Sequence, residues 1–188
     1  MHRYTCPALV MRFRGFSFVD QNGRRIRLNS FRGKALLLTF IYTRCPLPDY
    51  CIRMSSNFAE LAANLKHSEP EIYRRLQLLT ISIDPEYDKP SVLKEYGKRY
   101  AGGIDPNFQH WIFVSGTPAE TRQAAEFFGL TYFSTDGQNG QIVHSLRTAL
   151  IAPNGRIMIL YSGNDWKPAD IESELKKQHP SQKQGGES

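Results

Sequence analysis

The residues with the clearest chemistry are two cysteines, Cys45 and Cys51, with five residues between them. They follow an apolar run at residues 36–42, which is typical of a strand buried on both faces, and a helical pattern starts near Cys51. A helix N-terminus carries unpaired N–H groups and partial positive charge, so it stabilises a thiolate. The pattern therefore indicates a redox-active or metal-binding pair. The alternatives are a purely structural disulfide and two unrelated thiols.

Several other side chains are weaker candidates. Asp84 and Asp88 resemble a metal-binding or acid–base pair, but we favour a structural role, in which Asp84 ends a strand and Asp88 precedes a helix. His110 falls inside a strand pattern and is expected to be packed, and Met54 falls on the apolar face of a helix. No special role is expected for the candidates near the chain ends or at a helix end, which are Cys6, His2, His67 and His179.

Hydrophobic periodicity and turn residues divide the chain into an ordered series of elements. The predicted strands span residues 16–20, 26–28, 35–42, 76–83, 108–114, 130–134, 143–152 and 156–161. The predicted helices span residues 51–66, 91–100, 117–128 and 168–177. Thr117, Pro118 and Glu120 form a capping box at the start of the third helix. Turns are expected at residues 21–23 and 153–155, and a flexible loop at 136–140.

This order predicts an α/β fold with a central mixed β-sheet flanked by helices. An N-terminal hairpin precedes it, and a late hairpin adds antiparallel strands. A cysteine pair at the first strand-to-helix junction is the thioredoxin-like arrangement. We expect an irregular segment at residues 1–15, a single thioredoxin-like domain at 16–178 and a disordered tail at 179–188.

His144 supplies a third potential ligand. Ligands of open α/β sheets gather at the carboxyl ends of the strands, where Cys45, Cys51 and Asp84 fall. His144 follows the flexible loop, so the predicted topology places it near the same ends. Thiolates favour Cu(I), and imidazole suits Cu(I), Cu(II) and zinc. The alternative is a histidine that is hydrogen-bonded within a loop.

Length and composition fit one globular domain. The chain has 188 residues, of which 40% are hydrophobic and 22% charged, and no apolar run approaches the length of a membrane span. The net charge is +6, and residues 1–34 hold eight basic residues against Asp20 alone. This basic region indicates either attraction to anionic lipid or an acidic partner, or simply a solvated face. No aromatic-interleaved basic patch or zinc-finger spacing indicates nucleic acid.

Four motifs together resemble the Sco/SenC family of copper-binding proteins, which act in cytochrome c oxidase assembly. The match runs from Phe16 to about Lys177, and its motifs are Arg32-Gly33-Lys34, residues 40–46 (FIYTRCP), residues 84–88 (DPEYD) and Val143-His144-Ser145. The resemblance implies a thioredoxin-like fold that binds a copper ion, Cu(I) or Cu(II), through Cys45, Cys51 and His144. It also implies a partner that is the copper-site subunit of cytochrome c oxidase or another copper protein.

The family likeness further implies a domain tethered to the membrane on its extracytoplasmic, periplasmic side. Arg3, Arg12 and Arg14 interrupt the N-terminal residues, so no signal peptide is recognisable. The residues alone fit either a cytosolic protein or a targeting segment outside this sequence, and with the family likeness we expect the second. The family usually has three residues between its cysteines, whereas this chain has five. Because Pro46 and Pro48 favour extended residues before them, the loop is expected to bulge outward and return.

Two classes of function remain in competition. The first is a copper metallochaperone. The second is an enzyme, a thiol–disulfide oxidoreductase that keeps partner cysteines reduced and uses Cys45 and Cys51 as its redox pair. Such enzymes normally have two residues between their cysteines and a facing cis-proline, whereas Val143-His144 occupies that position here. A peroxiredoxin-type peroxidase and a non-catalytic binding module are further alternatives.

Overall fold

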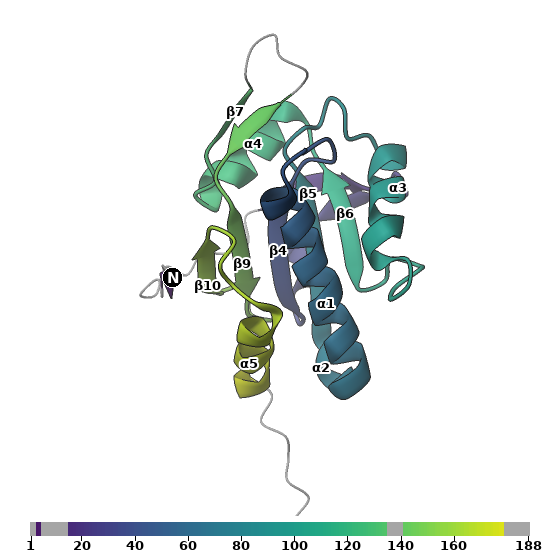
Figure 1. The fold of residues 1–188 in the computed structure, drawn as a ribbon, viewed down its shortest axis with the longest axis vertical. Coiled ribbons are helices and arrows are strands. Elements are labelled where there is room, and N and C mark those ends of the chain that lie inside the picture. The colour runs from purple at the N-terminus through teal and green to yellow at the C-terminus, as the bar shows by residue number, and fades with distance from the viewer. Residues whose placement is uncertain (1–2, 5–14, 135–140, 179–188) are drawn as a thin grey trace, which may run out of the picture.

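The computed structural model describes residues 3–4, 15–134 and 141–178, and its main feature is a mixed sheet. Eight described strands join in the order β1-β10-β9-β4-β5-β6-β2-β3 (Figure 1). They are β1 (Arg3–Tyr4), β2 (Ser17–Asp20), β3 (Arg25–Arg27), β4 (Ala35–Ile41), β5 (Leu76–Ser82), β6 (Trp111–Ser115), β9 (Arg147–Ile151) and β10 (Ile157–Ser162). The central strands β4, β5 and β6 are parallel, while β9 and β2 flank them in antiparallel orientation. The predicted central mixed sheet is therefore confirmed.

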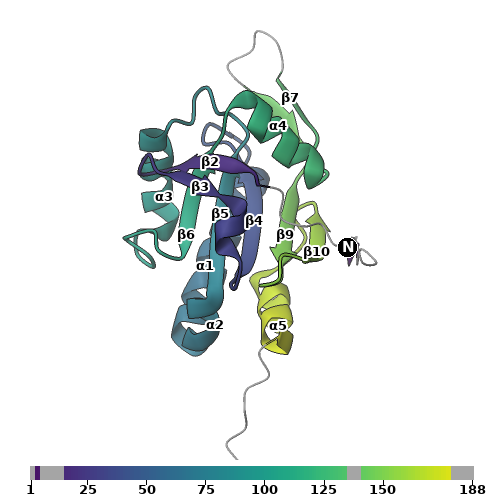
Figure 2. The same cartoon turned by 180° about the vertical axis from the view of Figure 1, so that it is seen from behind.

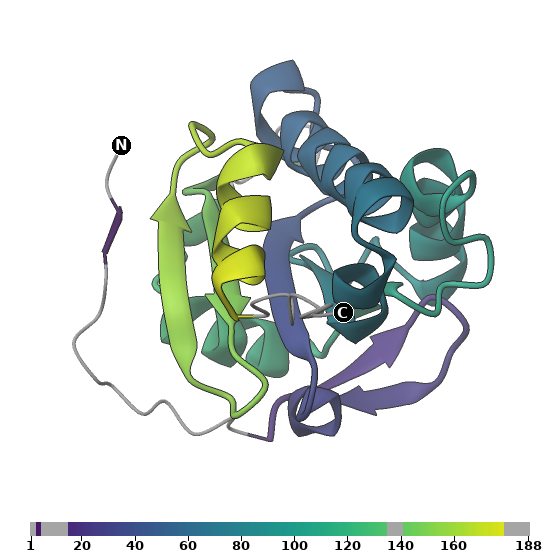
Figure 3. The same cartoon turned by 90° about the horizontal axis from the view of Figure 1, so that it is seen from below.

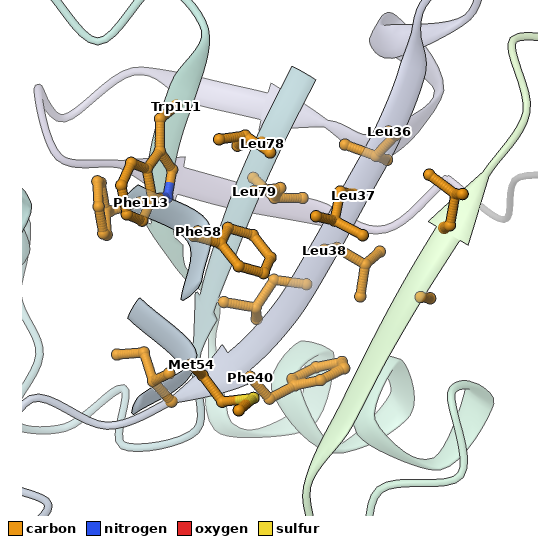
Figure 4. Packing of buried hydrophobic residues seen from close by; sticks show 14 of the residues in the cluster. Leu36, Leu37, Leu38, Phe40, Met54, Phe58, Leu78, Leu79, Trp111 and Phe113 are labelled. Atoms are coloured by element: carbon orange, nitrogen blue, oxygen red, sulfur yellow. The ribbon is translucent and has the colours of Figure 1, made fainter. Parts of the chain in front are cut away.

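The core lies around β4 and β5. All seven residues of each strand are buried, which confirms that the apolar run before the cysteines is a strand covered on both faces. Phe58 of the first long helix is fully buried in this core, and its ring centroid lies 5.8 Å from that of Trp111 in β6 (Figure 4). The loop that carries Cys45 therefore starts at the end of a strand that is buried throughout.

Helices cover both faces of the sheet. They are α1 (Arg53–Ser68), α2 (Pro70–Arg75), α3 (Pro90–Ala101), α4 (Pro118–Phe127) and α5 (Pro168–Gln178), with a 3₁₀ turn η1 (Leu28–Phe31). The blue α1 and the yellow α5 lie side by side on one face (Figure 3). Helix α4 lies on the opposite face, where Phe128, just beyond its end, packs against Phe40 of β4 (Figure 2). Met54 is fully buried on the inner face of α1, as predicted.

Several local predictions are confirmed. The Thr117 hydroxyl accepts the Glu120 amide, and the Glu120 carboxylate accepts the Thr117 amide, so the capping box forms. Gly23 and Gly155 have φ of 80° and 87°, which the tight turns of the β2–β3 and β9–β10 hairpins require.

The predicted continuous strand at residues 143–152 is wrong. It is divided into β8 (Ile142–His144), which pairs with β7 (Tyr132–Ser134) in a separate two-stranded ribbon, and β9, which joins the main sheet. Ser145 makes the break: its amide donates to the Thr131 carbonyl at 2.9 Å, and its hydroxyl accepts the Thr131 amide at 3.1 Å. These bonds hold His144 on the ribbon instead of in the main sheet.

Other boundaries also differ from the prediction. The helix expected from Cys51 begins with a π-helical turn, η2 (Pro48–Ile52), before α1. Strand β6 starts at Trp111 instead of the predicted residue 108, because the Asp105 carboxylate accepts the amides of His110 and Trp111 and holds a turn there. Helix α2 was not expected, and β1 lies within the segment expected to be irregular.

Some expectations concern parts outside the described residues. These are the loop at 136–140, the tail at 179–188, and the side chains of Cys6, His2 and His179. Within the described ranges, none of the helices has the length and apolar character needed to cross a membrane.

Candidate metal centre

Three side chains from separate elements converge at the carboxyl end of β4. Cys45 lies in the loop after β4, Cys51 lies in η2 just before α1, and His144 ends β8. Their ligand atoms all lie within 4.8 Å of one another, and the Cys51 Sγ is 3.6 Å from the His144 Nε2. No other group of three histidine, cysteine or acidic residues in the described chain is arranged to hold a metal ion.

The site is shielded from water. Cys45, Cys51 and His144 are 8%, 1% and 8% exposed, and neither cysteine is in a disulfide. Two thiols in contact can form a disulfide, or as thiolates they can bind a soft metal ion. The convergence predicted from the topology is therefore present, and the unrelated-thiol alternative does not describe this geometry.

The His144 ring is oriented for ligation. Its Nδ1 donates to the Ser145 carbonyl at 2.8 Å, so the neutral imidazole carries its lone pair on Nε2, the nitrogen that faces the sulfurs. The rings of Tyr42 and Tyr50 contact the imidazole edge-on, with ring centroids at 5.7 Å and 5.9 Å. The two tyrosines were missed from the sequence, although both lie next to the cysteine loop.

The two thiols have different proton affinities. The Cys51 thiol, joined by the His144 side chain and by the amides of Cys51 and Leu47, outweighs burial and lowers the pKa of Cys45 to about 4. The Cys51 thiol donates a hydrogen bond to Cys45 and is deeply buried, so its pKa is raised. Of the two thiols, Cys45 is therefore the one that gives up its proton more readily.

A buried carboxylate holds the loop that carries Cys45. Asp88 is fully buried, and it accepts the Thr43 amide at 3.0 Å, the Thr43 hydroxyl and the Ser82 hydroxyl at 2.5 Å. Burial raises the pKa of Asp88 in spite of these bonds. Asp88 therefore ties the loop after β4 to the loop after β5.

Asp84 makes a second tie between the same two loops. Its carboxylate pairs with Arg44 at 2.7 Å, and the Arg44 guanidinium lies 4.1 Å from the centre of the Tyr87 ring. Neither Asp84 nor Asp88 belongs to the ligand cluster. The structural role favoured for this acidic pair agrees with these contacts.

The remaining candidates lie away from the cluster. His110 is half-buried, and its ring lies tilted against that of Tyr73 with the ring centroids 4.5 Å apart. Its Nδ1 lies 3.4 Å from the Leu76 carbonyl oxygen. His67 is exposed near the end of α1. No cis peptide bond occurs in the described ranges, so the position facing the cysteines is a trans Val143-His144.

A small hollow opens beside the ligands. It has a volume of about 150 Å³ and is lined by Tyr42, Cys45, Pro46, Leu47, Tyr50 and residues 141–144. Leu47, Tyr50 and Val143 are large apolar side chains that remain 48%, 37% and 49% exposed at its rim. Burial raises the pKa of the Tyr42 phenol to about 12, so this hydroxyl stays protonated in the wall of the hollow.

The fold and the site define a thioredoxin-like protein whose dithiol faces a histidine. The SCO1/SenC family model matches residues 12–179, and the chain belongs to that family. An SCO1 protein homolog of Bacillus subtilis is 29% identical over 160 residues, which cover 82% of this chain and 76% of that protein. An SCO2-like protein of Rickettsia typhi is 32% identical over 145 residues, which cover 75% of this chain and 65% of that protein.

Solved structures share this fold. Copper-bound ScoI of Bradyrhizobium japonicum is 26% identical, with a TM-score of 0.68 over 86% of this chain and 96% of that one. A SCO1/SenC family lipoprotein of Bacillus anthracis is 26% identical, with a TM-score of 0.72 over 88% of this chain and 93% of that one. A third structure, BsSco, is 28% identical, with a TM-score of 0.68 over 87% of this chain and 91% of that one. It is described as having a disulfide switch and as a member of the Sco family of cytochrome c oxidase assembly proteins.

Proposed function

We propose that this protein is a copper metallochaperone that binds one copper ion through Cys45, Cys51 and His144. It delivers the ion during assembly of the copper site of cytochrome c oxidase. The observation that carries the proposal is the convergence of two sulfurs and one imidazole nitrogen within 4.8 Å. Copper is the cargo here, and transfer proceeds by exchange of these ligands for those of the recipient.

The donor set supports a soft ion. Thiolate sulfur favours Cu(I), and imidazole is accepted by copper in both oxidation states. Two cysteines and one histidine also suit zinc, so the donors alone leave copper and zinc open. The copper-bound ScoI structure, which shares 26% identity and the fold, supports copper.

The partner and the place of action follow from the same likeness. The relationship to a family of oxidase assembly proteins supports the copper-site subunit of cytochrome c oxidase, or another copper protein, as recipient. Similarity to a lipoprotein supports membrane association, and we place the domain on the extracytoplasmic, periplasmic side. Fractionation of the native host, followed by protease treatment of spheroplasts, tests this placement, and a protected cytoplasmic pool would contradict it.

Copper reconstitution tests the proposal. Protein carrying Cys6→Ser, so that only the site thiols remain, is supplied with Cu(I) under reducing, anaerobic conditions. We expect one copper per chain, and loss of tight binding when Cys45 or Cys51 is replaced by serine. Undiminished copper stoichiometry in both serine variants would defeat the proposal, and Asn154→Ser, in the distant β9–β10 turn, is the control that should bind normally.

One observation favours a second function, thiol–disulfide exchange. A thiolate of lowered pKa beside a protonated thiol is the arrangement of an attacking and a resolving cysteine. If the protein is a reductase of partner cysteines, its dithiol chemistry should not need the imidazole. The His144→Ala variant described in the Discussion separates the two functions.

A further inference from the structure

The loop between the two cysteines is longer than a minimal dithiol turn and carries an aromatic residue at its end. Residues 46–50 separate Cys45 from Cys51, and the second half of the loop forms the π-helical turn η2. Within it Tyr50 leaves helical geometry, with φ of −109° and ψ of −110°. This departure places the Tyr50 ring against the ring of His144.

Two hydrogen bonds hold the second half of the loop. The Tyr50 amide donates to the Leu47 carbonyl at 3.2 Å, and the Asn164 side chain donates to the Asp49 carbonyl at 2.8 Å. Asn164 lies between β10 and α5, so a distant part of the chain fixes the turn. The position of Tyr50 is therefore a built feature of the fold.

Tyr50 stands between the ligands and solvent. Its ring meets the imidazole edge-on at 5.9 Å and lines the hollow beside Cys45. It is 37% exposed, whereas the three ligands are 8% exposed or less. Together with Leu47 and Val143 its ring presents apolar carbon at the rim of the hollow, whose other side chains include the polar Tyr42 and Gln141, and a water molecule beside these carbons finds few hydrogen-bond partners.

We propose that Tyr50 is a specificity-determining residue that makes the site favour Cu(I) over Cu(II). Two soft thiolates and one imidazole suit Cu(I), whereas Cu(II) prefers tetragonal coordination by nitrogen and oxygen and needs further ligands. An apolar wall at the open side denies those further ligands to a bound ion. This inference rests on the proposed function, since it concerns the metal held by Cys45, Cys51 and His144.

The test compares Tyr50→Ala, Tyr50→Phe and the control Ile52→Ala in a Cys6→Ser background. Ile52 belongs to the same turn and is 39% exposed, but it does not line the hollow. Cu(I) and Cu(II) affinities are measured anaerobically by chelator competition. For Tyr50→Ala we expect the ratio of Cu(I) to Cu(II) affinity to fall tenfold or more, which corresponds to a drop of about 59 mV in the copper potential.

A second readout needs no metal. The rate at which a neutral alkylating reagent modifies Cys45 in the copper-free protein should rise in Tyr50→Ala, because the wall is removed. Tyr50→Phe keeps the wall and should behave like the parent protein in both measurements, as should Ile52→Ala.

Two results would overturn the inference. They are an unchanged ratio of Cu(I) to Cu(II) affinity in Tyr50→Ala, which includes equal changes of both affinities, and a Tyr50→Phe protein that matches Tyr50→Ala. If the parent protein binds no copper, the proposed function fails, whereas a parent that binds copper with an unmoved ratio in Tyr50→Ala removes only this inference. Thermal unfolding of each variant shows whether the site is folded, and Tyr50→Ser, which also removes the wall, replaces Tyr50→Ala if that variant does not fold.

Discussion

The buried carboxylate of Asp88 accepts both the backbone amide and the side-chain hydroxyl of Thr43, two residues before Cys45. The two residues are 45 positions apart in the chain and come from loops that follow neighbouring parallel strands. The conformation of the cysteine loop therefore depends on a group that lies outside it.

Replacing Asp88 by alanine should destabilise the protein. The change leaves the Thr43 amide and two hydroxyls without their acceptor in a buried place, and each such group costs about 1–3 kcal/mol. We expect the free energy of unfolding, measured by urea denaturation, to fall by at least about 2 kcal/mol. Asp49→Ala is the control, since its side chain is 77% exposed, and it should lie within about 0.5 kcal/mol of the parent. Equal stabilities of the two variants would contradict the role assigned to Asp88.

Replacing His144 by alanine should separate carrier from reductase. Loss of the third donor should weaken copper binding tenfold or more, about 1.4 kcal/mol or greater, while the Cys45–Cys51 disulfide still forms. Chelator competition and thiol titration in a redox buffer, on one preparation, give both quantities. His67→Ala, at an exposed position, should change neither. Unchanged copper affinity with altered dithiol chemistry would favour the oxidoreductase.

The reactivity of Cys45 should persist into acid. An ordinary thiol, with a pKa of about 8.5, is mostly protonated at pH 6 and reacts slowly. Because the pKa of Cys45 is lowered to about 4, its thiolate remains the main form until the pH falls to that value. Alkylation of Cys6→Ser protein, followed by mass spectrometry, should therefore proceed at Cys45 at nearly the same rate at pH 6 and pH 9.

The same experiment identifies the cause. Cys51→Ala removes the largest contribution to the lowered pKa, so the pKa of Cys45 should rise and its alkylation at pH 6 should slow. A pH profile for Cys45 that is identical with and without the Cys51 thiol would show that the hydrogen bond between them does not set the pKa.

Mild oxidation should link Cys45 to Cys51. The two sulfurs already lie within 4.8 Å, and closing so short a loop costs little chain entropy. Peptide mapping should show a Cys45–Cys51 crosslink, and the oxidised protein should no longer bind copper because the thiolates are consumed. Crosslinks found only through Cys6 would count against a site disulfide.

Much of the framework was predictable because it depends on local pattern. The buried strand β4 follows from an unbroken apolar run, and the start of α4 follows from Thr117, Pro118 and Glu120. The approach of His144 to the cysteines follows because it precedes a strand antiparallel to β4, which starts where β4 ends. These features need only the periods of strand and helix and the known topology of α/β sheets.

The rest depends on contacts between distant residues. The division of the strand after His144 comes from bonds between Ser145 and Thr131, and the contact of Tyr50 with His144 comes from a turn that leaves helical geometry. Asp88 reaches Thr43 only once both loops are folded. No short sequence pattern encodes such pairs, so a single sequence indicated the residues of the site but not what orients them.

The ligands depend on two separate sheets, because the cysteines lie beyond the end of β4 in the main sheet and His144 lies on the β7–β8 ribbon. A ribbon of two short strands has little stability of its own, and such elements open locally far more often than a buried core. If the protein carries copper as proposed, each opening of the ribbon withdraws the His144 imidazole from the ion, while the sulfurs of Cys45 and Cys51 remain bound to it. The lifetime of bound copper then depends on the backbone opening rate of the ribbon, and mutations that stiffen β7 or β8 should lengthen that lifetime.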